Sequence, residues 1–334
     1  MCDVATDSLI NSNFDQTPNR DEFLLIDGHA IIYRAYHAFP ELTDPNGQLV
    51  NAVYGFARIL LVAIRDFDPE YIAVCFDSKA KTLRAQEHDF YKANRAEMPD
   101  DLKPQIELVS QLVKALSIPQ FAIPGYEADD LIGTLATQNA LPEIQTQVKD
   151  GLLTVIVTGD KDLLQLVNDT THVWLPRRNR HQTDLEYDAH LVEEKMGVRP
   201  DQIVDLKALM GDASDNIPGV KGIGQKTAVK LLNRHQTLAK VYDRVAQLEL
   251  GESDDLIKGA MLTKLVTGKS NAYLSKELAQ IQVKSPISSC LEDCKITGYD
   301  KAKAVELFTQ LGFSSLIKLL PKDEFEQGVQ TALF

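Results

Sequence analysis

The sequence predicts an α/β protein with a mostly parallel sheet flanked by helices, followed by a helical domain. Up to about residue 184, short apolar segments typical of buried strands alternate with amphipathic segments, a pattern that favours a parallel sheet. From residue 185 onward the pattern is helical. We therefore expect a first domain over 22–184 and a helical domain over 185–320, with a disordered extension over 1–21 and a polar tail over 321–334.

The first domain contains five predicted strands, each a short apolar segment. They are 22–27, 70–77, 119–123, 153–158 and 171–175. Helices are predicted between them at 29–39, 49–66, 103–117 and 127–140. The segment 78–101 differs from the rest, because it is polar and basic with little hydrophobic pattern.

The second domain begins with residues whose apolar spacing is helical. It contains a glycine-rich segment at 211–232, followed by predicted helices at 236–248, 255–267 and 301–319. The chain has no run of about 18 apolar residues, so we expect no membrane span. Among its four cysteines, Cys290 and Cys294 lie close together, but no second pair accompanies them, and a reduced, intracellular protein fits best.

Acidic residues follow three of the predicted strands. Asp27, Asp77 and Asp160 each lie where a strand ends. Because the carboxyl ends of parallel strands meet at one edge of the sheet, we expect the three side chains to converge there. A single aspartate in such a place is commonly a helix cap or a turn residue, but three of them at one edge predict a site.

Six further acids extend this group to nine carboxylates. They are Glu127, Asp129 and Asp130 at a predicted helix start, Asp162 after the fourth strand, and Asp212 and Asp215 in the glycine-rich segment. Asp129 and Asp130 would also favour the helix dipole without any ligand. Hard divalent cations such as Mg²⁺ prefer oxygen ligands, and two of them together can hydrolyse a phosphodiester. The absence of cysteine and histidine from the set argues against zinc.

The net charge of −13 alone argues against a nucleic-acid partner, since phosphate binding requires cations. If nine acids bind metal, however, the remaining acids nearly balance the 35 basic residues. The acidity therefore requires only that basic residues be clustered.

One basic cluster lies in the polar segment after Asp77. Its cations are Lys79, Lys81, Arg84, Lys92 and Arg95, with Phe90 and Tyr91 among them. Cations and aromatic rings together suit a single strand, which offers phosphates and stackable bases. Lys92 and Arg95 are three residues apart, so on a helix they would share a face and could hold one phosphate. The alternative is an ordinary solvated loop.

A second candidate contact is the turn Gly222-Ile223-Gly224, followed by a helix that carries Lys226 and Lys230. Without side chains at the two glycines, backbone amides can approach a phosphate at the helix N-terminus. The alternative is a tight turn before a solvated basic helix.

These motifs resemble those of a known family. The segments LLIDGHAIIYRAYHAF, FDSKAKTLR, YKANRAEMPDDL, IPGYEADDLIGTLA, VTGDKDLLQLV and LMGDASDNIPGVKGIGQKTA occur in the order found in the 5′ nuclease domain of bacterial DNA polymerase I, a member of the flap endonuclease family. The resemblance runs from about residue 22 to residue 321. It implies a PIN-like nuclease domain, a helical arch over 78–101 (the arch segment) and a helix–three-turn–helix element.

The resemblance also assigns roles to the candidate residues. It implies two Mg²⁺ or Mn²⁺ ions, the first held by Asp27, Asp77, Glu127 and either Asp129 or Asp130. The second would be held by Asp160, Asp162 and Asp215, with Asp212 nearby. Tyr91, Lys92 and Arg95 match arch residues that engage the reacting phosphate, and Tyr33 matches a position that stacks near the cut. The turn over 211–224 matches one that binds potassium and touches duplex DNA.

The expected activity is therefore 5′-3′ exonuclease and 5′-flap endonuclease cleavage of DNA, in replication, including Okazaki fragment processing, and in repair. No polymerase domain follows, so we expect a free-standing 5′-3′ exonuclease. A monomer is the default expectation, and a DNA enzyme of this kind would be cytoplasmic and associated with the nucleoid. The terminal residues Gln330–Phe334 resemble a peptide that docks on the bacterial sliding clamp.

Two alternatives compete with this interpretation. One is a PIN-type ribonuclease, which would need neither the glycine turn nor the basic arch segment. The other is a non-catalytic DNA-binding protein, for which nine carboxylates at one sheet edge would be costly and unexplained.

Overall fold

The computed structural model describes residues 20–148, 150–176, 184–296 and 298–322. In this part of the chain, six strands form one sheet in the order β3-β2-β1-β4-β5-β6. Every neighbouring pair is parallel except β5 and β6. The bounds are β1 Asp21–Asp27, β2 Tyr71–Cys75, β3 Gln120–Phe121, β4 Leu152–Val157, β5 Thr171–Leu175 and β6 Leu185–Tyr187. The predicted fold class is confirmed.

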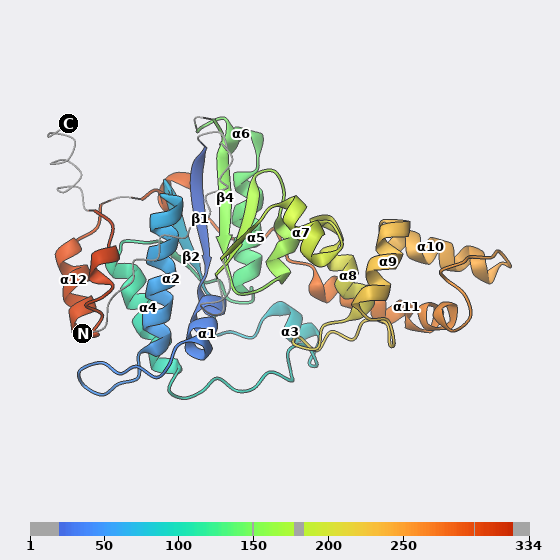
Figure 1. Cartoon of the computed structure of the whole chain (residues 1–334), viewed down its shortest axis with the longest axis horizontal. Helices are drawn as coiled ribbons and strands as arrows, with labels where there is room; N and C mark the ends of the chain where they lie inside the picture. Colours follow the sequence, from blue (N-terminus) through green and yellow to red (C-terminus); the bar gives the residue numbers. More distant parts are fainter. Residues whose placement is uncertain (1–19, 149, 177–183, 297, 323–334) are drawn as a thin grey trace, which may run out of the picture.

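Helices cover both faces of the sheet (Figure 1). Leu24 and Ile26 of β1 pack with α1 Gly28–Ala38, α2 Asn51–Phe67 and α4 Lys103–Ala115. Phe23 and Leu25 point to the opposite face and pack with α5 Ala128–Asn139. This alternation explains why the central strands are almost continuously apolar, since both of their faces are buried.

The helical domain continues the core on the α5 side of the sheet. Its main helices are α7 Ala189–Met196, α8 Ile203–Met210, α9 Gln225–His235, α10 Leu238–Glu249 and α11 Ala260–Ala279. The predicted helix at 255–267 starts later and runs to residue 279. Sequence periodicity missed its second half because small residues form its buried face: Gly268 lies against Val220, where a Cβ would be 2.7 Å from Val220 Cγ1.

Two parts of the predicted helical domain belong structurally to the first domain. Strand β6 pairs antiparallel with β5, so the sheet extends beyond residue 184. Near its end the chain returns, and α12 Lys301–Gln310 contacts α4 and buries Phe308 in the core beside α2 (Figure 1). The short elements α6 Pro142–Gln145, η1 Asp162–Leu166, η2 Pro200–Gln202, η3 Leu291–Cys294 and η4 Ile317–Leu319 complete the described elements apart from α3.

The arch segment contains one short helix, α3 Leu83–Glu87, and is otherwise made of turns and coil. The prediction that Lys92 and Arg95 share a helical face is therefore wrong, and Lys92 adopts a positive φ of 55°. Backbone groups here form isolated turns, such as the bond from Arg95 N to Lys92 O at 3.1 Å, and they also bond to the loop after α8. Lys92 N donates to Asp215 O at 3.0 Å, and Asn216 Nδ2 donates to Phe90 O at 2.7 Å.

None of the helices in the described ranges combines the length and the apolar character that crossing a membrane requires. The predicted clamp-docking peptide, 330–334, and residues 1–19 of the predicted extension lie outside those ranges.

Candidate metal centre and nucleic-acid interface

An open cavity of about 660 Å³ lies at the carboxyl ends of β1, β2 and β4, beside the N-terminus of α5. Five of the nine predicted carboxylates line it: Asp27, Asp77, Glu127, Asp129 and Asp160. Tyr33, Lys92 and Arg95 line it as well. The convergence expected from strand topology is thus present in the structure.

The carboxylates of Asp27 and Asp77 are oriented by the N-termini of two helices, α1 and α5. Asp27 is the N-cap of α1, where Oδ1 accepts from Ala30 N at 3.1 Å and Oδ2 from the Thr158 hydroxyl at 2.7 Å. Asp77 reaches across to α5 and accepts from Ala128 N at 2.8 Å. Each aspartate therefore caps a helix, but in doing so its carboxylate is also held at the cavity.

The electrostatics of this cavity favour bound cations. Burial raises the pKa of Asp27 to about 7, and the neighbouring Asp77 and Asp160 contribute in the same direction. Burial, together with Glu127, also raises the pKa of Asp129 well above its usual value. Carboxylates that repel one another in this way need cations to stay ionised. An oxygen-rich set of donors around one cavity fits hard divalent cations such as Mg²⁺ and Mn²⁺.

Asp129 and Asp130 are adjacent on α5 but face different surroundings. Asp129 lines the cavity. Asp130 is 2% exposed, and both of its oxygens bind the Arg84 guanidinium at 2.6 and 3.0 Å. It also closes a capping box with Glu127 at the start of α5. The structure therefore places Asp130 away from the cavity, as a structural partner of Arg84. The sequence left the choice between Asp129 and Asp130 open as a metal ligand, and of the two Asp129 is the one that lines the cavity.

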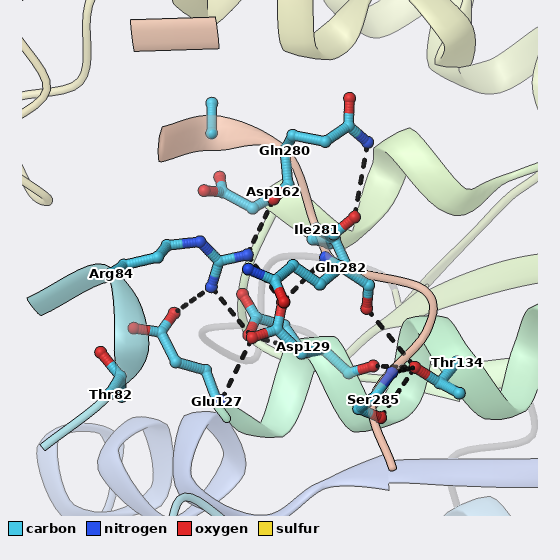
Figure 2. Close-up of polar contacts among 12 residues, drawn as sticks. Thr82, Arg84, Glu127, Asp129, Thr134, Asp162, Gln280, Ile281, Gln282 and Ser285 are labelled. Carbon is cyan, nitrogen blue, oxygen red and sulfur yellow. Dashed lines mark hydrogen bonds and ion pairs between the residues drawn. The ribbon is translucent and has the colours of Figure 1, made fainter. Parts of the chain in front are cut away.

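Arg84 was predicted to bind DNA, and its position contradicts that role. The side chain is buried, and its guanidinium contacts Glu127 at 3.2 Å (Figure 2) and Asp130 at 2.6 Å. Its Nη2 also donates to Gln280 O at 2.7 Å, just after α11. Both terminal nitrogens of this buried guanidinium already contact Glu127, Asp130 or Gln280, so Arg84 joins the arch segment to α5 and to the residues after α11.

The other arch residues contact the acids directly. Lys92 Nζ lies 2.8 Å from Glu127 Oε2 and 3.9 Å from Asp215, while Arg95 Nη2 lies 2.5 Å from Asp215 Oδ1. The Tyr91 hydroxyl donates to Glu127 at 3.2 Å, and its ring is buried. Burial would raise the pKa of Glu127, but the cations of Lys92 and Arg84 outweigh it and lower that pKa.

A second group of acids lies outside the lining of the cavity. Asp162 and Asp212 both form ion pairs with Lys207, a buried lysine of α8 that the sequence reasoning did not identify. Burial raises the pKa of Asp162 to about 7, with Asp160 adding to it. Asp160 also links the two groups, since its Oδ1 accepts from Asp162 N at 2.9 Å.

The face of α1 at the cavity was only partly predicted. Along with Tyr33, the cavity is lined by His29 and His37, which lie four residues to either side of it. Helical spacing from Tyr33 could have identified both. The His29 Nδ1 accepts from Asp77 N at 3.0 Å, so this ring supports the loop that carries Asp77.

The predicted duplex contact lies on the surface of the helical domain. Gly222 has a φ of 83°, and Gly224 is the N-cap of α9, where a Cβ would meet no atom within 4 Å. Lys226 and Lys230 are exposed on α9. Lys79 and Lys81 of the arch segment are exposed too, with Lys81 paired to Asp89 at 2.9 Å. Backbone and cations at both places are thus open to a ligand.

Comparison with solved structures reproduces the arrangement of the two domains. The bacteriophage T5 flap endonuclease, solved with DNA and metal ions, matches with a TM-score of 0.59 at 19% identity, over 89% of this chain and 96% of that chain. The catalytic core of Rad2 with a DNA substrate matches with a TM-score of 0.54 at 18% identity, over 90% and 93% of the two chains. At these identities the matches show the fold alone.

Sequence comparison identifies the family. Residues 22–197 match the 5′-3′ exonuclease N-terminal resolvase-like domain, and residues 198–302 match the 5′-3′ exonuclease C-terminal SAM fold. DNA polymerase I of Caldicellulosiruptor bescii is 41% identical over 308 residues, which are 92% of this chain and 34% of that protein. The chain spans about a third of the length of the curated relatives it matches. The chain belongs to the 5′-3′ exonuclease family, which confirms the family predicted from its motifs.

Proposed function

We propose that the chain hydrolyses DNA phosphodiester bonds as a metal-dependent 5′-3′ exonuclease and 5′-flap endonuclease. One observation carries the proposal: carboxylates from three strand ends and the start of α5 converge on a single cavity that Lys92 and Arg95 also line. The acids can hold metal beside a bound phosphate, while the two cations stabilise the charge of that phosphate.

The acids divide into two candidate metal subsites. Asp27, Asp77, Glu127 and Asp129 line the cavity together and would hold the first cation. Asp160, Asp162 and Asp215, with Asp212 beside them, would hold the second. When bound, two such cations supply an activated water and stabilise the leaving oxygen. The oxygen donors favour Mg²⁺ or Mn²⁺ as the cations.

The chain's own cations have a separate role toward the substrate. Lys92 and Arg95 pair with Glu127 and Asp215, and once those acids hold metal the two cations can turn to the reacting phosphate. Tyr91 supports them through its bond to Glu127. Tyr33 lies at the cavity, where its ring could stack on the base beside the cut. The exposed Lys79 and Lys81 would follow the single strand.

The helical domain would hold the duplex part of the substrate. The amides around Gly222 and Gly224 and the exposed Lys226 and Lys230 form a phosphate-binding surface at the start of α9. We also propose a potassium ion at this turn. The Gly222 carbonyl already accepts from the Lys264 ammonium at 3.0 Å, which supports a place for a cation there. Stronger duplex binding in K⁺ than in Na⁺ at equal ionic strength would be the expected result.

A single assay separates the proposed function from its alternatives. The protein is incubated with 5′-flap DNA and a matched RNA, each in Mg²⁺ or in EDTA. We expect cleavage of the DNA in Mg²⁺ only. Cleavage of the RNA but not of the DNA would indicate a ribonuclease. Binding of the DNA without cleavage of either substrate, in Mg²⁺ or in EDTA, would indicate a non-catalytic protein. The fragment pattern also separates trimming from the 5′ end from cutting at the flap junction.

We further propose that the enzyme acts as a monomer on the chromosome in replication or repair, and that Gln330–Phe334 docks on the sliding clamp. The docking proposal rests on the sequence of the peptide, which ends in apolar residues that suit a hydrophobic pocket. Deleting residues 330–334 should weaken binding to a purified bacterial clamp. Equal affinity of the shortened and complete chains would refute it.

A further inference from the structure

Lys207 occupies an unusual place beside the second candidate metal subsite. It lies within α8 and is 8% exposed, and its ammonium forms ion pairs with both Asp162 and Asp212. The distance to Asp212 Oδ2 is 2.6 Å. The two aspartates come from different parts of the chain, η1 and the loop after α8. One ammonium therefore holds together two carboxylates of the acid group.

The positions of these groups show what the ammonium does. It places one positive charge in contact with two carboxylates, while Asp212 Oδ1 also accepts from Ser214 N at 2.8 Å and from the Ser214 hydroxyl at 2.5 Å. The ammonium thus lies beside both carboxylates, where a divalent cation of the proposed second subsite would also lie.

A charged lysine cannot itself ligate a metal, because an ammonium has no free lone pair. It can only compete with the metal or repel it. Lys92 and Arg95 belong to the arch segment, which has little regular structure around them, and they pair with Glu127 and Asp215. Lys207 differs because its backbone is fixed in a buried helix. If a divalent cation displaces its ammonium, the charge can retreat only by the length of its side chain.

We propose that Lys207 is an internal counter-cation that competes for the second metal subsite and lowers its affinity. The inference rests on the proposed two-metal function. It makes Lys207 a positioning residue that acts through Asp162 and Asp212. The second cation then binds more weakly than the first, and its binding is coupled to release of the Lys207 ammonium.

The test is a titration of the complete protein with Mn²⁺, with free Mn²⁺ followed by its EPR signal. Lys207→Met removes the charge and keeps most of the side-chain length. We expect the dissociation constant of the weaker Mn²⁺ to fall by about tenfold, the lower end of what one neighbouring charge does to the proton affinity of a carboxylate. Lys207→Arg keeps the charge and should bind the weaker Mn²⁺ no more tightly than the wild type.

Lys276→Met is a matched control, since Lys276 also pairs with a buried aspartate on α8, Asp205, at 2.7 Å. It should leave Mn²⁺ binding unchanged. If the dissociation constant of the weaker Mn²⁺ site in Lys207→Met is unchanged or higher than in the wild type, Lys207 is structural or helps to orient the ligands. That result would overturn the inference. A wild-type protein that binds no Mn²⁺ would overturn the proposed function as well, so the two failures are distinguishable.

Thermal unfolding provides a second readout. In EDTA, Lys207→Met leaves two carboxylates without their counter-cation, so its melting temperature should fall below that of the wild type. Saturating Mn²⁺ should then raise the melting temperature of the variant more than that of the wild type, because a ligand at a given concentration stabilises the folded state more when its dissociation constant is lower. Equal stabilisation of the two proteins would contradict the inference. If Lys207→Met does not fold in EDTA, Lys207→Gln serves as the second neutral variant in both measurements.

Discussion

Asp129 and Asp130 show how neighbouring residues of one type can have different roles. Asp129 lines the cavity, whereas Asp130 holds Arg84 with both oxygens. We predict that Asp129→Asn weakens Mn²⁺ binding by at least about tenfold and lowers the proposed flap cleavage, because it removes a carboxylate of the proposed first metal subsite. Asp130→Asn should mainly lower the unfolding free energy, because it weakens a buried ion pair. Mn²⁺ titration and urea unfolding of both variants check this, and equal loss of Mn²⁺ affinity would refute the distinction.

Glu22 gives a prediction about pH. Burial, with Glu186 and Asp68 nearby, raises its pKa in the folded protein from 4.5 to about 7. The folded state therefore binds the proton of the Glu22 carboxyl group more tightly than the unfolded state does. The stability that it contributes is complete below pH 4.5 and is lost as pH rises through 7.

Glu22→Gln should remove this pH dependence. At pH 8 the variant should melt higher than the wild type by roughly 1–2 °C, which corresponds to about 1 kcal/mol after allowance for screening by solvent. Near pH 5 the difference should be much smaller, because Glu22 is then protonated in the folded wild type. Melting curves of both proteins in the same Mg²⁺ buffer measure the difference. A constant offset between pH 5 and pH 8 would contradict the assignment to Glu22.

At the scale of elements, Arg84 joins three segments that are far apart in the sequence. It belongs to α3, pairs with the start of α5, and donates to Gln280 after α11. We predict that Arg84→Met lowers the unfolding free energy by about 3–5 kcal/mol, because it leaves Glu127 and Asp130 buried with a missing partner. Urea unfolding measures the loss.

Arg65→Met is the control for this prediction. Arg65 also pairs with an aspartate, Asp66 at 2.6 Å, but its side chain is 53% exposed. Exposed pairs contribute roughly 0–1 kcal/mol, so this variant should unfold almost as the wild type does. If the two arginine variants lose similar stability, Arg84 does not have the anchoring role inferred from its burial.

The sequence predicted the elements best where their pattern was apolar. Strand ends followed from β-strand patterning, and with them the convergence of Asp27, Asp77 and Asp160. The second half of α11 was missed because its buried face consists of small residues such as Gly268. The contacts of Arg84 could not be predicted, since a basic residue in a polar segment gives no sign of a buried partner more than forty residues away.

At the scale of the whole molecule, the two domains share one continuous structure. The helical domain extends the core on the α5 side of the sheet, and the chain then returns so that α12 packs beside α4 on the opposite side (Figure 1). A boundary drawn where the pattern changes from alternating to helical misses this return. Hydrophobic periodicity describes one segment at a time, and it does not say which distant surface that segment covers.

To bind DNA as proposed, this acidic molecule must use a few basic places, and α9 is a candidate for one of them. The chain has a net charge of −13, but Lys226 and Lys230 place two exposed positive charges close together in the first turns of α9. We predict that the variant with both lysines changed to alanine binds duplex-containing flap DNA more weakly. Its plot of log affinity against log salt should lose a slope of about 2, because each lost phosphate contact removes roughly 0.9. Fluorescence anisotropy in EDTA at several salt concentrations measures both quantities without cleavage.

Lys114 provides the matched control for the salt prediction. It is exposed on α4, on the side of the first domain that α12 covers in part, and far along the chain from the α9 turn. Lys114→Ala changes the net charge in the same direction without removing a lysine from α9. It should therefore leave the salt slope as in the wild type. Suppose that each lysine removed, whether Lys114 or one of the two on α9, reduces the slope of log affinity against log salt by the same amount. Overall charge, and not the α9 surface, would then govern DNA binding. A slope unchanged in both would place the duplex elsewhere on the molecule.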